Sequence, residues 1–135
     1  MNNIELYKRC IKRADMHFAS GVILLDSLTN NYIISGSHLY YTAEIYLKAL
    51  LLYNGFKYDE LDKIGTDLLA ILKKCSEFDK SLALFTKELK ILQKFENITT
   101  LFKVERIDIE KLIKTVNSLK IAVINSCNKK PISKS

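Results

Sequence analysis

Apolar residues recur every three or four positions over residues 4–28 of this 135-residue chain, and charged residues fill the positions between them. This spacing is typical of an amphipathic α-helix that buries one face. It predicts a long first helix, followed by a break at Asn30 and Asn31, because asparagine favours turns. The apolar stripe consists of Tyr7, Ile11, Ala14, Phe18, Val22, Leu25 and Leu28.

A second segment, residues 37–54, is apolar on nearly every side of its helical repeat. Glu44 and Lys48 are its only charged residues. A helix that is apolar all round is packed by neighbours on several sides. The pattern therefore predicts the central helix of the fold, and Asn54 and Gly55 supply a left-handed stop after it.

The rest of the chain predicts three more helices. Residues 57–66 are polar and acidic and are expected to form a loop or a single turn. Thr66 or Asp67 should then cap a third helix, a fourth should begin near Ser81, and a fifth should begin at the N-cap residue Asp108. The expected buried faces are Leu68, Leu69, Ile71, Leu72 and Cys75; Leu82, Phe85, Leu89, Leu92 and Phe95; and Ile109, Leu112, Val116, Leu119 and Val123.

These elements predict an all-α fold, a single up-and-down bundle of four to five helices. Four glycines and one proline are too few for a protein rich in β-turns. The domain should span residues 1–127. Residues 128–135 contain lysines, serines and the single proline, and we expect them to form a flexible basic tail.

The cysteines Cys10, Cys75 and Cys127 are odd in number, far apart and without C-x-x-C spacing. We expect three buried free thiols and no metal site, which favours a reducing, cytoplasmic location. Asp15 and Asp26 interrupt the apolar N-terminal stretch, so it does not match a secretory signal. No stretch is apolar enough to span a membrane.

The net charge of +6 lies entirely in the C-terminal part of the chain. Residues 1–80 contain ten basic and ten acidic residues, whereas residues 81–135 contain eleven and five. This asymmetry favours an acidic or polyanionic partner, although solvated lysine-rich helix faces explain it equally well. The candidate nucleic-acid or nucleotide contacts are Lys103, Arg106, Lys111, Lys114, Lys120 and the tail lysines.

Motifs for catalysis or cofactor binding are absent from the sequence. It contains no glycine-rich phosphate loop and no nucleophile elbow, and no cofactor is expected. The only histidines are His17 and His38, and each is expected to be an ordinary half-buried side chain. Because His17 lies one turn after Arg13, an anion-binding cluster is the alternative for that residue.

Charges on an otherwise apolar helix must be paired or directed at a cleft. Glu44 lies four residues before Lys48, the favourable order for an intrahelical ion pair. We expect this pair to be partly buried beside a groove against the first or last helix. Two interpretations stay open: a purely structural pair, or one that lines a binding groove for a ligand or partner together with Tyr41.

Three stretches in the central part of the chain form a recognisable pattern: Tyr41-x-x-Glu44-x-x-Leu47-Lys48-Ala49-Leu50-Leu51, then Asn54-Gly55, then Asp67-Leu68-Leu69-x-x-Leu72. With this pattern the chain resembles the HEPN domain family over about residues 5–127. The resemblance implies a four- or five-helix bundle that often dimerises, with roles in RNA cleavage or in binding RNA, nucleotides or a toxin or antitoxin.

The chain departs from the pattern of the catalytic members of that family. In these members, four to six residues stand between an arginine and a following histidine, towards the last helix. Neither histidine here has an arginine at that spacing: the positions before His17 are Lys12, Ile11 and Cys10, and those before His38 are Ile33, Tyr32 and Asn31. Thr66 occupies the place of a common family histidine, and threonine cannot transfer a proton near neutral pH. Arg106 corresponds to the family arginine, but no histidine follows it.

Two classes of function follow from these observations. All seven tyrosines lie at or before Tyr58, away from the basic end, which favours a protein partner over bases stacked on aromatic rings. We therefore expect a non-catalytic, homodimeric interaction module of a toxin–antitoxin or phage-defence system. It would bind a toxin, an antitoxin or a nucleotidyltransferase, and RNA or nucleotide through its basic C-terminal part. The alternative is a HEPN-type ribonuclease with an atypical active site.

Overall fold

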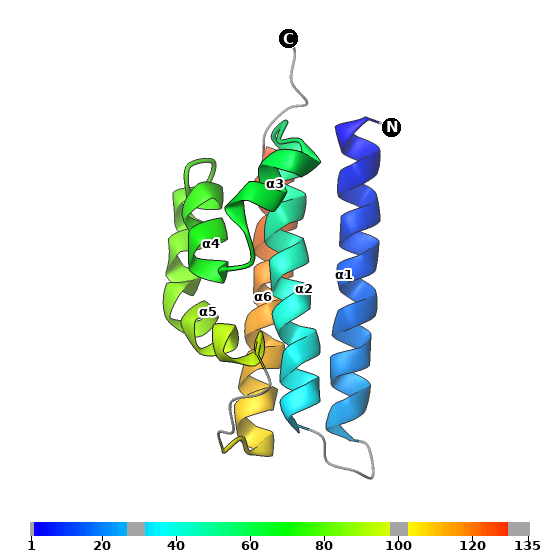
Figure 1. Cartoon of the computed structure of the whole chain (residues 1–135), viewed down its shortest axis with the longest axis vertical. Coiled ribbons are helices and arrows are strands. Elements are labelled where there is room, and N and C mark those ends of the chain that lie inside the picture. The colour runs from blue at the N-terminus through cyan, green and yellow to red at the C-terminus, as the bar shows by residue number, and fades with distance from the viewer. Residues whose placement is uncertain (1, 27–31, 98–102, 130–135) are drawn as a thin grey trace.

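Three long helices and a set of short ones make up the computed structural model, which describes residues 2–26, 32–97 and 103–129. No β-strand occurs in these ranges, and the predicted all-α bundle is confirmed. These ranges contain six α-helices, where the sequence predicts four to five. They are α1 (Asn3–Leu25), α2 (Tyr32–Tyr53), α3 (Tyr58–Ile64), α4 (Leu68–Ser76), α5 (Thr86–Leu92) and α6 (Arg106–Lys129), with 3₁₀ helices η1 (Lys80–Phe85) and η2 (Gln93–Phe95) (Figure 1).

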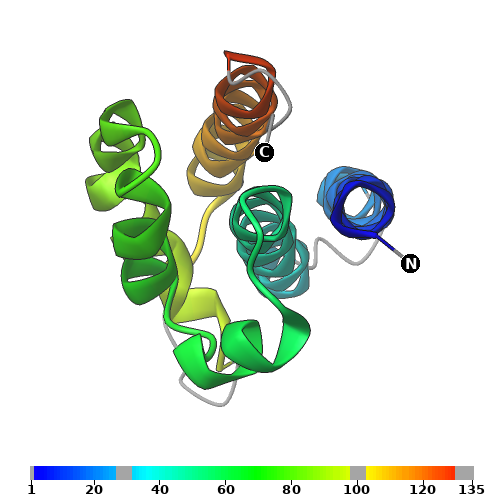
Figure 2. The ribbon, with the colours of Figure 1, turned by 90° about the horizontal axis from the view of Figure 1, so that it is seen from above.

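Helix α2 lies at the centre of the bundle, as its sequence predicts. Seen from above, it is surrounded by α1 on one side and by α6 and the short helices on the others (Figure 2). Its leucines and alanines are all buried, and so is the side chain of Tyr46. Among the described residues, no helix combines the length and the apolar character that crossing a bilayer requires.

The start of α2 is five residues earlier than the sequence suggests. The sequence predicts a start at about Ser37, and the serine and glycine that precede this residue are weak helix formers. Tertiary packing overrides this preference, because the hydroxyl of Ser35 donates a 2.5 Å hydrogen bond to the carbonyl oxygen of Gly21. Gly36 packs directly against the ring of Phe95.

Helix α1 ends at Leu25, three residues before the predicted end, and the expected break at Asn30 and Asn31 lies outside the described residues. The stop after α2 is confirmed: Gly55 has φ of 100°, a conformation that favours glycine. The segment predicted as a loop or single turn is instead the two-turn helix α3.

Asp67 caps α4 by accepting a 2.9 Å hydrogen bond from the amide of Leu69, as predicted. The predicted fourth helix is divided between η1, α5 and η2. Helix α6 begins at Arg106, so Asp108 is not its N-cap residue. The carboxylate of Asp108 instead accepts a bond of 2.9 Å from the amide of Glu105, which is one half of a capping box.

The predicted buried stripe of α6 is confirmed at all five positions. The helix also includes Asn128 and Lys129, the first two residues of the expected tail. The other six tail residues lie outside the described part of the chain.

Candidate functional site

A cleft of about 420 Å³ opens between α1, α2 and α3. We call it the α1–α2–α3 cleft. Each helix contributes residues at helical spacing, because positions three or four apart point to the same side. Its lining combines basic, acidic and aromatic side chains over an apolar base: Cys10, Arg13, His17, Tyr41, Glu44, Ile45, Lys48, Tyr58, Leu61 and Asp62.

His17, a lining residue of this cleft, contacts His38, which is not part of the lining. The Nδ1 atoms of His17 and His38 lie 3.2 Å apart, a hydrogen-bonding distance. The ring of Tyr41 lies beside that of His17, with 5.8 Å between ring centroids. Burial lowers the pKa of His17, and the charges of His38 and Arg13 lower it further. His17 is therefore held mainly in its neutral form near neutral pH.

Each histidine is half-buried, as predicted, but nothing in the sequence indicated that the two would be in contact. They are 21 residues apart on different helices, and only the antiparallel packing of α1 on α2 brings them together. The only sequence signal for a site here was the spacing of Arg13 and His17, which are four residues apart and therefore lie on one side of their helix. Both residues do line the cleft, together with Lys48.

Glu44 and Lys48 form the predicted intrahelical ion pair, with 2.9 Å between Lys48 Nζ and Glu44 Oε2. Their side chains are 11% and 18% exposed, so both are largely removed from water. The groove that they line is bounded by α1 and α3 rather than by the last helix. Tyr41, predicted to share this groove, is present in it and is 41% exposed.

Two exposed tyrosines face the basic residues of the cleft. Tyr58 is 47% exposed and lies at the start of α3. Burial and the neighbouring Cys10 thiol raise the pKa of Tyr58, whereas the charges of Arg13 and Arg9 oppose that rise. Two arginines on successive turns of α1 thus lie close to this ring.

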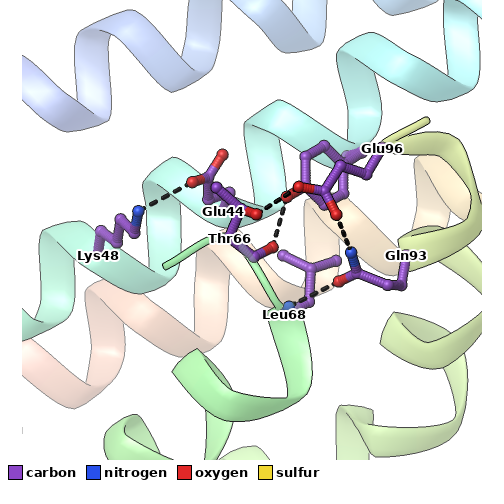
Figure 3. A network of polar contacts seen from close by, with 7 residues as sticks. Glu44, Lys48, Thr66, Leu68, Gln93 and Glu96 are labelled. Atoms are coloured by element: carbon purple, nitrogen blue, oxygen red, sulfur yellow. Dashed lines mark hydrogen bonds and ion pairs between the residues drawn. The ribbon is translucent and has the colours of Figure 1, made fainter. Parts of the chain in front are cut away.

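A network of polar contacts lies next to the Glu44–Lys48 pair and joins three segments of the chain (Figure 3). The hydroxyl of Thr66 donates to the carboxylate of Glu96, which also accepts a bond of 2.5 Å from Gln93 Nε2. The side-chain oxygen of Gln93 accepts a bond of 2.7 Å from the amide of Leu68. The network therefore fastens the start of α4 to η2.

Tyr40 connects this network to the central helix. Its hydroxyl donates to the backbone oxygen of Thr66. Burial raises the pKa of Tyr40, and the Glu44 carboxylate raises it further, so the hydroxyl keeps its proton at physiological pH. Thr66 acts here through hydrogen bonds that hold the chain in place, and it offers no group that titrates near neutrality.

The five basic residues proposed from the sequence do not converge on one surface site. Three of them are paired with acidic residues: Lys103 with Glu105 at 3.8 Å, Arg106 with Asp26 at 2.6 Å and Glu110 at 3.2 Å, and Lys120 with Asp15 at 2.9 Å. Lys103 and Lys111 line one hollow beside α6, and Lys114 lines another.

Cys10, Cys75 and Cys127 are buried and form no disulfide, as predicted. Burial raises the pKa of Cys75, and its thiol donates to the backbone oxygen of Leu47, so this thiol is not poised for reaction. Within the described ranges, no three histidine, cysteine, aspartate or glutamate side chains are grouped in a way that could hold a metal ion.

Comparison with known proteins gives one family assignment. The family model described as HEPN domain matches residues 7–126, which is most of the chain. No curated protein matches the sequence, and no solved structure matches it either. The match covers every residue that lines the α1–α2–α3 cleft.

Proposed function

The chain belongs to the HEPN domain family, and from this premise we propose that it is a binding module for a phosphate-bearing ligand, either a nucleotide or a segment of single-stranded RNA, held in the α1–α2–α3 cleft. One observation carries the proposal. The guanidinium of Arg13 lies in a cleft flanked by the exposed rings of Tyr41 and Tyr58. A guanidinium binds phosphate through charge-assisted hydrogen bonds, and a nucleic-acid base stacks on an aromatic ring.

The charges in the cleft favour the Arg13 side for the phosphate. Lys48 is engaged with Glu44, so this pair contributes little net charge. Arg13 has no ion pair within the described part of the chain, and Arg9 lies close by on the preceding turn. His17, which contacts His38, adds a hydrogen-bonding group to the lining.

The fold supports a nucleic-acid or nucleotide ligand more than the sequence pattern does, which favours a protein partner. In the sequence, the tyrosines are remote from the basic C-terminal part, which favours a protein partner. In three dimensions, Tyr41 and Tyr58 lie beside N-terminal basic residues instead. The C-terminal residues Lys103, Arg106 and Lys120 are occupied in ion pairs, which supports the cleft rather than α6 as the ligand site.

Fluorescence anisotropy with a labelled decauridylate RNA, with AMP as a competitor, tests this proposal. We expect Arg13→Gln to weaken binding by about tenfold or more, since a hydrogen bond to a charged group contributes about 1.5–3 kcal/mol. The slope of log K against the logarithm of the salt concentration should also become shallower by about one unit, because one phosphate contact is lost. The matched control is Lys12→Gln, an exposed neighbour on α1 outside the cleft.

The control and a double variant on α6 distinguish a ligand site in the α1–α2–α3 cleft from one on α6. Lys12→Gln should bind within about twofold of the wild type, as expected for a peripheral charge. Equal losses in Arg13→Gln and Lys12→Gln would refute the cleft. A loss confined to the double variant Lys111→Gln and Lys114→Gln would place the ligand on α6.

RNA cleavage in the same cleft is the second candidate function, and the contact between His17 and His38 favours it. One imidazole could take the proton of the 2′-hydroxyl, whose oxygen then attacks phosphorus. The other could give a proton to the departing 5′-oxygen, which leaves a 2′,3′-cyclic phosphate. This arrangement replaces the arginine-to-histidine spacing that the sequence lacks.

Product analysis on a structured RNA separates cleavage from binding. For a binding module, wild type and Arg106→Ala should show the same background, as the sequence predicts. Cyclic-phosphate products that disappear in His38→Ala but persist in Arg106→Ala would establish an atypical ribonuclease. Cleavage that disappears in Arg106→Ala would instead point to α6.

A further inference from the structure

The contact between His17 and His38 can hold one extra proton but not two. The two Nδ1 atoms lie 3.2 Å apart, so one ring donates an N–H to the lone pair of the other. One protonated imidazole still donates to a neutral neighbour, because only one proton then lies between the two atoms. Two protonated rings would direct two N–H groups and two positive charges at each other. The pair therefore has a neutral and a singly charged form that both keep the contact.

Only one member of this pair is placed to meet a ligand of the α1–α2–α3 cleft. His17 lines the cleft, whereas His38 is not part of the lining. The ring of His17 lies beside the rings of His38 and Tyr41, with centroid distances of 5.5 and 5.8 Å. Because Nδ1 of His17 is engaged by His38, Nε2 is the ring nitrogen that a ligand would meet.

Arg13 places a second cationic group beside His17. The two residues are four positions apart on α1, so their side chains are neighbours on the helix surface, and both line the cleft. The charge of Arg13 lowers the pKa of His17, so the two groups repel each other when both are charged. A phosphate bound between them attracts both and offsets that repulsion.

Histidine is the group in this cleft that can take up a proton near neutral pH. Its ordinary pKa lies between pH 5 and 8, whereas carboxylates, phenols and ammonium groups ordinarily titrate outside that interval. Glu44 and Lys48 form an ion pair of their own at 2.9 Å. The charged and titratable groups that share the cleft with His17, from α1, α2 and α3, are Arg13, Tyr41, Glu44, Lys48, Tyr58 and Asp62.

We propose that binding of an RNA phosphodiester in the α1–α2–α3 cleft is coupled to the uptake of one proton by the His17–His38 pair, so that the cleft binds RNA more tightly in mildly acidic solution. This inference rests on the proposed function and assigns the two histidines different roles. His17 donates a hydrogen bond from Nε2 to a phosphate oxygen beside Arg13. His38 does not touch the ligand; it is a positioning residue that orients the ring of His17.

The direction of the effect follows from the charge of His17 in the free and bound states. Burial and the neighbouring charges hold the pKa of His17 below its ordinary value of about 6.5, so the ring is mainly neutral at pH 7.5 in the free chain. A bound phosphate favours the charged ring and raises this pKa. The bound state then holds more protons than the free state, and the affinity rises as the pH falls.

Fluorescence anisotropy with rhodamine-labelled decauridylate, from pH 7.5 to pH 5.5 at constant salt, tests the coupling. Neither the phosphodiester nor uracil titrates in this range, so a change in affinity reports on the protein. We expect the wild type to bind about tenfold more tightly at pH 5.5, because a hydrogen bond from a charged group is stronger than one from a neutral group. His17→Gln, which cannot take up a proton, should change by less than about twofold.

Two further variants separate the roles within the cleft. His38→Gln should keep the pH dependence but begin it at a higher pH, because a group that lowers the pKa of His17 is removed. The matched control is Asp62→Asn, an exposed position of α3 in the same cleft, which should keep the wild-type pH profile. A merely structural role for His38 would leave the midpoint of the profile where it is.

Proton NMR gives a second measurement that needs no variant at position 17. The chain contains only two histidines, so the ring-proton signals of the untagged protein can be assigned with His38→Gln. Saturating decauridylate should raise the pKa of His17. This titration decides the question if His17→Gln does not fold, and loss of the fold at acidic pH would weaken binding, which is opposite to the expected effect.

Three results would overturn the coupling. They are an affinity of the wild type that does not change with pH, a tenfold rise that survives in His17→Gln, and no binding of decauridylate at any pH. Binding that depends on Arg13 but not on pH refutes the coupling and leaves the proposed function standing. If the RNA does not bind, direct titration with AMP decides separately whether the proposed function stands.

Discussion

His17 on α1 and His38 on α2 lie with their Nδ1 atoms 3.2 Å apart, and this contact joins the two helices beside the α1–α2–α3 cleft, which His17 lines. One ring must present a lone pair to the other, so the contact is satisfied when at least one imidazole is neutral. Burial, together with the charges of His38 and Arg13, lowers the pKa of His17 and favours that state.

The first prediction is a loss of stability on mild acidification. With the pKa of His17 below its ordinary value of about 6.5, the unfolded chain binds more protons than the folded one between these two pKa values. The contribution of His17 is therefore complete above about pH 6.5 and is lost as the pH falls through the pKa of the folded state. Thermal melts from pH 8 to pH 5 should show a steeper fall in Tm for the wild type than for His17→Gln. Parallel curves would contradict this assignment.

The second prediction concerns Glu44 and Lys48. Lys48→Met leaves a largely buried carboxylate without its partner and should cost about 3 kcal/mol, the lower end of the range for buried pairs. The double variant Glu44→Leu and Lys48→Met should cost much less, since it removes both charges. Urea unfolding of Lys48→Met, Glu44→Leu and the double variant measures this difference. Equal stabilities in all three would show that both groups are solvated.

A pull-down with the decauridylate RNA extends the same experiment to function. If the pair is structural, the double variant should fold and keep the ligand. If the pair also lines the binding site, the double variant should fold and lose it. These are the two interpretations that the sequence left open.

The third prediction is a clash at Gly36. Gly36→Ala places a methyl group against the buried ring of Phe95 and should cost about 2–3 kcal/mol through overpacking. Adding Phe95→Leu removes the ring edge, so the double variant should be more stable than the sum of the two single effects predicts. Chemical denaturation of the set gives the coupling, and strictly additive effects would mean that the two side chains do not meet.

The fourth prediction is a homodimer formed through the outer face of α1. The leucines of α2 are all buried and are not available to a second copy of the chain. Met16 and Ile23 of α1 are 65% and 70% exposed instead. HEPN domains commonly dimerise, and apolar side chains exposed on one helix face favour association.

Light scattering during size-exclusion chromatography checks this prediction. The wild type should have twice the chain mass of 15.5 kDa. Ile23→Glu should shift it towards the monomer, and Leu84→Glu, a comparable change at an 83% exposed residue of η1, should not. A wild-type monomer at micromolar concentrations would rule the dimer out.

Much of the fold follows from local pattern and could be predicted without the structure. The apolar repeat located α1 and α6, and the continuous apolar run identified α2 as the central helix, because burial requires these periodicities whatever the neighbours are. Local chemistry also narrowed the cap of α4 to Thr66 or Asp67 and located the stop at Gly55. The ion pair of Glu44 and Lys48 was predictable for the same reason, since i,i+4 geometry is a property of one helix.

Only the tertiary structure decided which of these helices meet, and therefore where the candidate sites lie. The contact of His17 with His38, the approach of Tyr58 to Arg13 and the packing of Phe95 on Gly36 all join residues that are distant in the sequence. Packing also extended α2 through Ser35 and Gly36 against their intrinsic preference. Helix periodicity determines which side of a segment is buried, but it carries no information about which other segment will cover that side.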